Sequence, residues 1–229
     1  MAGDEKPLMR QTENSAPGRG LLLRLLVSGI VLAVWFWTQS LIGARTAPSS
    51  GIGDGLHNLT AGLNSYFAQN AGAANALLVA SSSLIDALGL FLVGRWLLGG
   101  SIRPFFGLFL LMTLRQLMQA ICALPPPPNM IWHYPGFPSL LVTYHVANDF
   151  FFSGHTAIAV FGAIELSRLR RNWLTVAAVL LVVFEIATVL ILRAHYTMDV
   201  FAGIVAALWV GRLSERISPR LDRLIGGRT

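Results

Sequence analysis

The chain has 229 residues, of which 54% are hydrophobic and only 12% are charged, whereas about 25% are charged in a typical soluble domain. So few charges exclude a soluble globular domain, and the single cysteine, Cys122, excludes a disulfide framework and a cysteine-based metal site. We attribute the net charge of +6 to basic loops on one side of a membrane, and we expect no nucleic-acid partner.

Six apolar windows are long enough for membrane-spanning helices, which need about 20 residues. We therefore predict an all-α integral membrane protein with a transmembrane domain at residues 21–213, a polar basic tail at 1–20 and a second basic tail at 214–229. The first window lacks a convincing cleavage site after it, so we interpret it as a retained span. The six predicted spans are Leu21–Ile42, Ala73–Leu97, Pro104–Leu124, Phe150–Leu166, Trp173–Leu192 and His195–Leu213.

The distribution of Lys and Arg predicts how the chain is oriented in the membrane. With a cytoplasmic N-terminus, fourteen of the 17 basic residues lie on the inner side, and only Arg45 and Arg193 lie on the outer side. Because cytoplasmic loops are enriched in Lys and Arg, we expect both termini in the cytoplasm and loops 43–72 and 125–148 outside.

Each of the two outer loops has a distinct pattern. The first carries Leu56, Leu59, Leu63 and Phe67 at helical spacing, which predicts a short helix lying in the outer interface. The second has no Lys, Arg, Asp or Glu, opens with Pro125–Pro128 and is rich in aromatic residues. We interpret its Trp and Tyr side chains as interface anchors, with a cation–π cage for a choline headgroup as the alternative.

One candidate catalytic histidine, His195, stands at the start of the sixth predicted span. His195 and Asp199 are four residues apart, so on a helix they share a face and can touch. An aspartate bonded to one imidazole nitrogen fixes the tautomer and raises the basicity of the other nitrogen. We therefore expect the free nitrogen of His195 to act as a nucleophile or base.

The other candidate, His155, stands at the start of the fourth predicted span, on the same side of the membrane as His195. His155 follows Ser153 and Gly154, where a helix start offers free N–H groups, and such a terminus is a ready anion site. Arg193 adds a positive charge close to His195 in sequence. These residues together predict a phosphate-handling site, in which one histidine attacks phosphorus and the other transfers the proton.

Two blander interpretations stay open. The histidines could be structural, or His155, His195 and Asp199 could form a metal-binding facial triad, although that would leave the phosphate-binding features unexplained. We expect the remaining intramembrane charges to pair within the bundle and fix its packing. These are Asp86, Arg115, Glu165 and Glu185.

The two motifs resemble those of a known enzyme group. Residues 148–156 (NDFFFSGHT) and 195–200 (HYTMDV) resemble the C-terminal signatures of sphingomyelin synthases, within the lipid phosphatase/phosphotransferase (PAP2) superfamily. Arg115 and the exit at Leu124–Pro127 resemble the preceding motif of the same enzymes. The plant phosphatidylcholine:diacylglycerol cholinephosphotransferases are at least as similar, notably in FFSGH and in the arginine two residues before HYT.

The resemblance implies a PAP2-like six-helix bundle and a role for each matching residue. His195 would be the nucleophile that forms a phosphohistidine, Asp199 would orient it, and His155 would be the general acid and then the base. Further residues would bind the substrate or its phosphate, without metal or cofactor. They are Arg193, Asp149, Ser153, Gly154, Tyr196 and Arg115.

The sequence departs from the family at two places. Ala147 and Asn148 replace the cysteine and glycine before the aspartate of the first motif, which puts the headgroup in doubt. The phosphatidate-phosphatase motif Lys-x6-Arg-Pro is missing before the site, which favours a transferase.

The function expected from this resemblance is transfer of a phosphocholine-type headgroup from a glycerophospholipid to ceramide or diacylglycerol at the outer membrane face. Two alternatives remain. The same site would be a lipid phosphatase or a phospholipase C if water intercepted the phosphohistidine, and a protein of this fold without turnover would bind or transport lipids. Membrane lipids are the expected partners in each case, and no oligomeric state is predicted.

Overall fold

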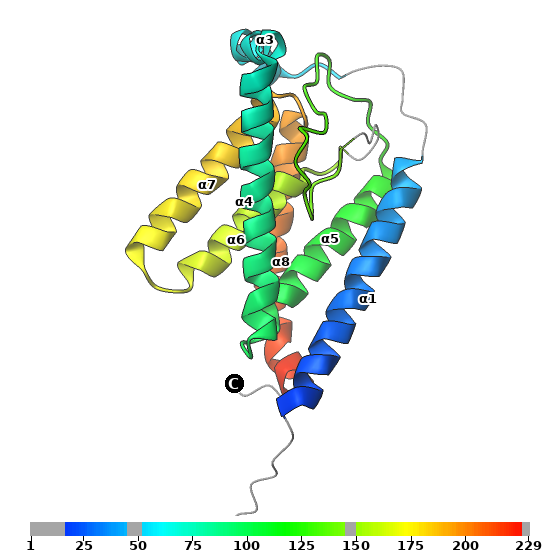
Figure 1. Cartoon of the computed structure of the whole chain (residues 1–229), viewed down its shortest axis with the longest axis vertical. Helices are drawn as coiled ribbons and strands as arrows, with labels where there is room; N and C mark the ends of the chain where they lie inside the picture. Colours follow the sequence, from blue (N-terminus) through cyan, green and yellow to red (C-terminus); the bar gives the residue numbers. More distant parts are fainter. Residues whose placement is uncertain (1–16, 45–51, 145–149, 226–229) are drawn as a thin grey trace, which may run out of the picture.

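The computed structural model describes residues 17–44, 52–144 and 150–225, and within these ranges it contains eight helices and no β-strand. Five of the helices are long and apolar enough to cross a membrane, which confirms an all-α protein with several candidate spans. These are α1 (Pro17–Gly43), α4 (Ala71–Leu97), α5 (Arg103–Ile121), α7 (Asn172–Ile191) and α8 (Thr197–Ile225). The described chain begins and ends at the same end of the bundle (Figure 1).

The fourth predicted span is shorter in the structure than in the sequence pattern. It corresponds to α6 (Gly154–Ser167), whose 14 residues give a length of about 21 Å, less than the ~30 Å hydrocarbon core. The helix starts late because Ser153 is its N-cap and accepts a hydrogen bond from the amide of Thr156. Helix α6 therefore does not count among the five candidate spans.

Helix α6 nevertheless lies at the centre of the molecule, where it packs against α4, α5, α7 and α8. The ring of Phe161 is fully buried and lies against Gly107, where an added Cβ would come within 2.1 Å of it. On the other side of α6, Gly203 of α8 approaches the backbone oxygen of Ser153 so closely that a Cβ would lie 2.8 Å away. These two glycines let α5 and α8 pack closely against α6, the helix that carries His155.

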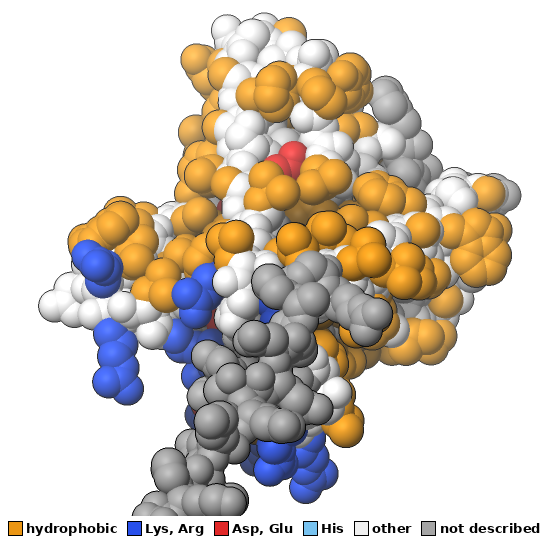
Figure 2. All heavy atoms as spheres, turned by 60° about the horizontal axis from the view of Figure 1, so that its bottom comes forward, with side chains coloured by type: hydrophobic (Ala, Val, Ile, Leu, Met, Phe, Trp, Pro, Cys, Tyr) orange, Lys and Arg blue, Asp and Glu red, His pale blue; other side chains and the backbone are white. Residues whose placement is uncertain are grey.

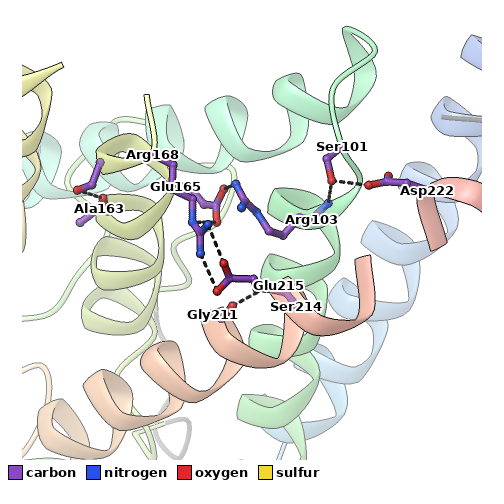
Figure 3. Close-up of polar contacts among 10 residues, drawn as sticks. Ser101, Arg103, Ala163, Glu165, Arg168, Gly211, Ser214, Glu215 and Asp222 are labelled. Carbon is purple, nitrogen blue, oxygen red and sulfur yellow. Dashed lines mark hydrogen bonds and ion pairs between the residues drawn. The ribbon is translucent and has the colours of Figure 1, made fainter. Parts of the chain in front are cut away.

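Ion pairs join three helices at the end of the bundle away from His155, as Figure 3 shows, and the carboxylate of Glu165 among them is buried. Arg103 donates to Glu165 at 2.6 Å, and Arg168 pairs with Glu215 at 3.1 Å, so α5, α6 and α8 are cross-linked. The expected pairing of Glu165 within the bundle is thus confirmed. Lys and Arg side chains gather around this end, whereas the flanks of the bundle are hydrophobic (Figure 2).

Helix α8 is longer than the predicted sixth span at its C-terminal end. It continues past Leu213 to Ile225, so most of the predicted 214–229 tail is helical. One reason is that the carboxylate of Asp222 accepts hydrogen bonds from the amide of Ile102 at 2.7 Å and the hydroxyl of Ser101 at 2.6 Å. The end of α8 therefore satisfies free donors at the start of α5.

The first of the two predicted outer loops is helical in its described part, as its leucine spacing predicts. It forms α2 (Gly55–Leu59) and α3 (Ala61–Gln69), with Leu56, Leu59 and Leu63 exposed. The second predicted outer loop begins with an extended Cys122, and its described residues 122–144 are not helical, since the proline run at Pro125–Pro128 cannot continue α5. Asp86 of α4 anchors that loop by accepting hydrogen bonds from Ser139, Leu140 and Leu141.

Candidate active site

His195 lies in a sharp turn between α7 and α8, rather than on the helix that the sequence pattern predicts. Helix α7 ends in a Schellman motif, in which the amide of Ala194 bonds the carbonyl of Val189 at 2.8 Å and that of Arg193 bonds Leu190 at 3.2 Å. Arg193 has the left-handed φ of 56° that this motif requires, although glycine is the usual residue there. Helix α8 begins after this turn at Thr197, and the carboxylate of Asp199 in its first turn accepts a hydrogen bond from the amide of Tyr196.

The hydrogen bonds of His195 fix its tautomer. Its Nδ1 lies 2.8 Å from the backbone carbonyl oxygen of Phe150. A carbonyl oxygen can only accept, so Nδ1 must carry the proton. The Nε2 of neutral His195 is then a lone-pair nitrogen, and it has no hydrogen-bond partner among the described residues. The tautomer of His195 is thus fixed by the Phe150 carbonyl, whereas the sequence analysis expected Asp199 to fix it.

Asp199 is fully buried and lies close to His195 without bonding it directly. Its Oδ2 is 3.8 Å from the Nδ1 of His195, too far for a hydrogen bond, and instead accepts from the amide of Tyr196 at 2.9 Å. The expected shared helical face does not form, because α8 starts only at Thr197. Asp199 therefore has two effects: it caps α8, and it places a carboxylate near the imidazole.

His155 lies in the first turn of α6 and is 7% exposed. Its Nε2 is buried and has no hydrogen-bond partner among the described residues, so it is available to a substrate atom. The amides of Gly154 and His155 precede the first intrahelical bond, and no described residue accepts from them. Ser153 is fully buried as the N-cap, so its side chain supports the helix start.

One small cavity brings the two histidines together. His155, His195, Gly154 and Arg115 all line a space of about 40 Å³, which is enough for one or two water molecules. The Nε of Arg115 donates to the carbonyl of Phe152 at 3.1 Å, and a Cβ added to Gly154 would lie 3.0 Å from that Nε. Glycine at 154 therefore lets a guanidinium approach the start of α6, and Arg115 is the cation of this cavity.

Two other predicted phosphate ligands, Arg193 and Tyr196, do not line the cavity. Arg193 donates to the carbonyls of Pro128 at 2.9 Å and His57 at 3.2 Å, so its guanidinium ties two outer loops together and does not line the cavity. Tyr196 is buried beside the outer loops, and its hydroxyl contacts the carbonyl of Pro126 at 3.4 Å. Asp149 lies outside the described residues.

Sequence reasoning did not single out His57, which supports the site from α2. It is 4% exposed, and its Nε2 lies 2.9 Å from the backbone carbonyl of His195, to which it must donate. Its ring stacks on that of Tyr196 with centroids 5.7 Å apart. No sequence motif surrounds His57. The one feature that could have marked it as functional is that a histidine occurs within the predicted interfacial helix.

Asp54 connects the same outer helix to the start of α8. Its carboxylate accepts from the hydroxyl of Thr197 at 2.6 Å and from its amide at 2.5 Å, while also capping α2. Burial raises the pKa of Asp54, but the hydrogen bonds from Thr197 and His57 outweigh burial and hold the pKa below its ordinary value. The contact is therefore complete above pH 3.8 and weakens as the pH falls through the lower folded-state pKa.

Aromatic residues of the second outer loop pack beside the cavity. The ring of Trp132 lies edge-on to His155 with centroids 5.1 Å apart, and it also contacts Tyr144 at 5.4 Å. Tyr134 contacts Tyr144 at 6.1 Å. The three rings pack on one another, and only Trp132 lines the cavity. Among the described residues, no three His, Cys, Asp or Glu side chains gather in a metal-binding arrangement.

Comparison with known proteins places this site in a family. A family model described as AtPDCT1/2 matches residues 54–216, which include both histidines of the cavity, Arg115, His57 and Asp54. The chain belongs to the AtPDCT1/2 family. The match begins at Asp54, so the α2 contacts with α8 lie inside the family region.

A curated relative supports the same AtPDCT1/2 assignment. The chain is 25% identical over 188 residues to phosphatidylcholine:diacylglycerol cholinephosphotransferase 1 of Arabidopsis thaliana. The match covers 80% of this chain and 60% of the relative, so the chain spans about three fifths of the relative's length. No solved structure matches the chain.

Proposed function

We propose that this AtPDCT1/2 family protein transfers a phosphocholine-type headgroup from a glycerophospholipid to a lipid alcohol through a phosphohistidine on His195. The observation that carries the proposal is the hydrogen bond from Nδ1 of His195 to Phe150, which leaves Nε2 as a lone-pair nitrogen in the cavity that His155 and Arg115 also line. The name of the Arabidopsis relative supports phosphatidylcholine as donor and diacylglycerol as acceptor. Ceramide is the second acceptor to test.

The proposed reaction has two balanced steps. In the first, Nε2 of His195 attacks phosphorus, the N–P bond forms, the P–O bond to diacylglycerol breaks, and protonated His155 gives its proton to the leaving oxygen. In the second, neutral His155 takes the proton of the acceptor hydroxyl, that oxygen attacks phosphorus, and the N–P bond breaks. Arg115 and the first amides of α6 would balance the phosphate charge.

We also propose a six-crossing topology of the PAP2 type with both termini in the cytoplasm. Helix α6 supplies the sixth crossing beside the five candidate spans, with the non-helical residues 150–153 completing its path through the membrane. The Lys and Arg gathered at the end where α1 begins and α8 ends support a cytoplasmic location for that end (Figure 2). The histidine pair would then be reached from the outer leaflet.

The test uses the purified full-length protein in lipid nanodiscs. Phosphatidylcholine labelled in its choline is supplied with diacylglycerol or ceramide of a distinct chain length, with and without EDTA. We expect labelled phosphatidylcholine or sphingomyelin carrying the acceptor's chains, unaffected by EDTA. Free phosphocholine as the sole product would instead establish a hydrolase. Loss of activity in EDTA, with rescue by a divalent ion, would support the metal-binding alternative. Lipid binding without any product would indicate a non-catalytic protein.

Variants of three histidines control this test. His155→Ala and His195→Ala should both lose transfer, because each removes a group of the cavity. His133→Ala is the matched control, since His133 lies on the same outer side but contacts Asn75 at 2.7 Å and does not line the cavity. Equal activity of all three variants would contradict the assignment.

A further inference from the structure

A second, much larger cavity lies between α1 and α5. It encloses about 340 Å³ and is lined almost entirely by apolar side chains, including Val31, Leu32, Phe109 and Leu117. Its lining runs from residue 28 to 41 on α1 and from 105 to 120 on α5, which at 1.5 Å per residue is a groove about 20 Å long. We refer to this cavity as the α1–α5 groove.

The α1–α5 groove adjoins the histidine cavity directly. Trp35 of α1, Met112 of α5 and Leu141 of the second outer loop line both spaces. The two cavities are thus neighbours that share three lining side chains. One helical turn from Trp35 and Met112, Gln116 donates to Gln39 at 3.0 Å and Arg115 donates to the same Gln39 oxygen at 3.5 Å, so polar groups lie where the groove approaches Arg115.

The groove is accessible from the flank of the bundle because α1 packs loosely. Helix α1 stands at the edge of the molecule beside α5 (Figure 1). Among its described side chains only Ser28, Trp35 and Gln39 are buried. Val34 and Leu41, which line the groove, are largely exposed on the same helix. A lipid could therefore enter sideways from the membrane.

We propose that the α1–α5 groove binds one acyl chain of the glycerophospholipid donor, with the phosphodiester at the histidine pair. Trp35 and Met112, which line both cavities, are seven residues from the end of the groove at residues 28 and 105, so the groove extends about 10 Å from the histidine cavity in that direction. Each leaflet contributes about half of the ~30 Å hydrocarbon core, so the groove holds about two thirds of a chain about 15 Å long. This inference rests on the proposed function, because it assumes a lipid donor at that site. It identifies the substrate as a membrane lipid held in its leaflet, with the headgroup alone reaching the cavity.

Photo-crosslinking tests the groove without requiring turnover. Full-length protein in nanodiscs receives phosphatidylcholine with a diazirine at the end of one acyl chain, and the labelled peptides are mapped after irradiation. We expect adducts on residues 28–41 and 105–120. Labelling should fall in Val31→Trp, because the added indole would fill the groove. It should be unchanged in Ile30→Trp, because the neighbouring Ile30 is exposed and does not line the groove. Labelling spread evenly over exposed apolar residues such as Phe201 and Val179 would mean annular lipid only and would overturn the proposal.

Substrate length gives a second measurement. Val31→Trp should lower kcat/KM for long-chain phosphatidylcholine at least about 10-fold, because even single methylene contacts are worth that much in a pocket, and should leave turnover of the chainless nitrophenyl phosphocholine unchanged. Ile30→Trp should leave both unchanged. Equal loss on both substrates would overturn the groove assignment. If wild-type protein is inactive but crosslinks within the groove, the groove stands and the proposed reaction fails.

Discussion

At the scale of single residues, the proposed mechanism assigns the orientation of His195 to the Phe150 carbonyl and the negative charge beside its ring to Asp199. The carbonyl holds the Nδ1 proton of His195, while the carboxylate is 3.8 Å away and contributes charge. Orientation and charge stabilisation can therefore be separated by mutation, which is not possible where one carboxylate does both.

Asp199→Asn should keep the fold and lose much of the activity. The amide oxygen can still accept from the Tyr196 amide, but the negative charge beside the imidazole disappears. Two unit charges 3.8 Å apart interact by about 4 kcal/mol at an effective dielectric of 20, which sets an upper limit near 10³-fold on the loss in kcat. Steady-state kinetics with thermal unfolding as the control tests this; an unchanged kcat would remove Asp199 from the mechanism.

His57 should act as a positioning residue through the backbone of His195. His57→Phe keeps a ring beside Tyr196 but removes the donor to the His195 carbonyl, and a small displacement of the nucleophile should lower kcat about 10- to 100-fold. His57→Gln restores a donor and should recover part of that loss. Equal kcat in both variants, or an unchanged KM and kcat in His57→Phe, would show that this bond does not position the site.

These residue contacts also mark the limit of what the sequence could predict. The two histidines and Arg115 were predicted and lie in one cavity: His155 is in the first turn of α6, His195 is just before α8, and Arg115 comes from the interior of α5. The direction of Arg193 was not predictable, because it depends on a left-handed turn that sends its guanidinium toward Pro128 and His57. The partner of His195 was missed because a backbone carbonyl leaves no signature in residue types.

At the scale of elements, the close approach of α8 to the start of α6 holds the two histidines in register. Gly203→Ala should place a methyl group 2.8 Å from the Ser153 carbonyl, force the helices apart, and lower the free energy of unfolding by about 1–3 kcal/mol. Thermal unfolding in nanodiscs measures the loss. Gly94→Ala in α4 is the control, since a Cβ there meets nothing within 4 Å; equal destabilisation of both variants would argue against this contact.

The helix boundaries show which elements hydropathy could predict. Five long apolar windows became candidate spans, because burial in lipid and in protein both select apolar residues. The fourth window was overextended: its first residues, Phe150–Phe152, are apolar yet supply backbone carbonyls to His195 and Arg115, and are not helical. Hydropathy reports the burial of these rings but not the use of their backbone.

At the scale of the whole molecule, the proposed orientation predicts which surfaces face the outside. In a Cys122→Ser background, a cysteine introduced at the exposed Ser65 of α3 should react with an impermeant thiol reagent in intact cells, and one at the exposed Asn172 of α7 should react only after permeabilisation. The reason is that the two positions lie at opposite ends of the bundle. The reverse pattern would invert the topology and place the histidine pair on the cytoplasmic side.

The central claim is that His195 becomes phosphorylated while His155 transfers the proton, and trapping the intermediate tests it most directly. Nitrophenyl phosphocholine is mixed with full-length protein, quenched without acid, and analysed by intact mass and peptide mapping. We expect an adduct on His195 in the wild type and in His133→Ala, and also in His155→Ala, because nitrophenolate leaves without a proton. His195→Ala should carry none. An adduct on His155, or one that persists in His195→Ala, would contradict the account.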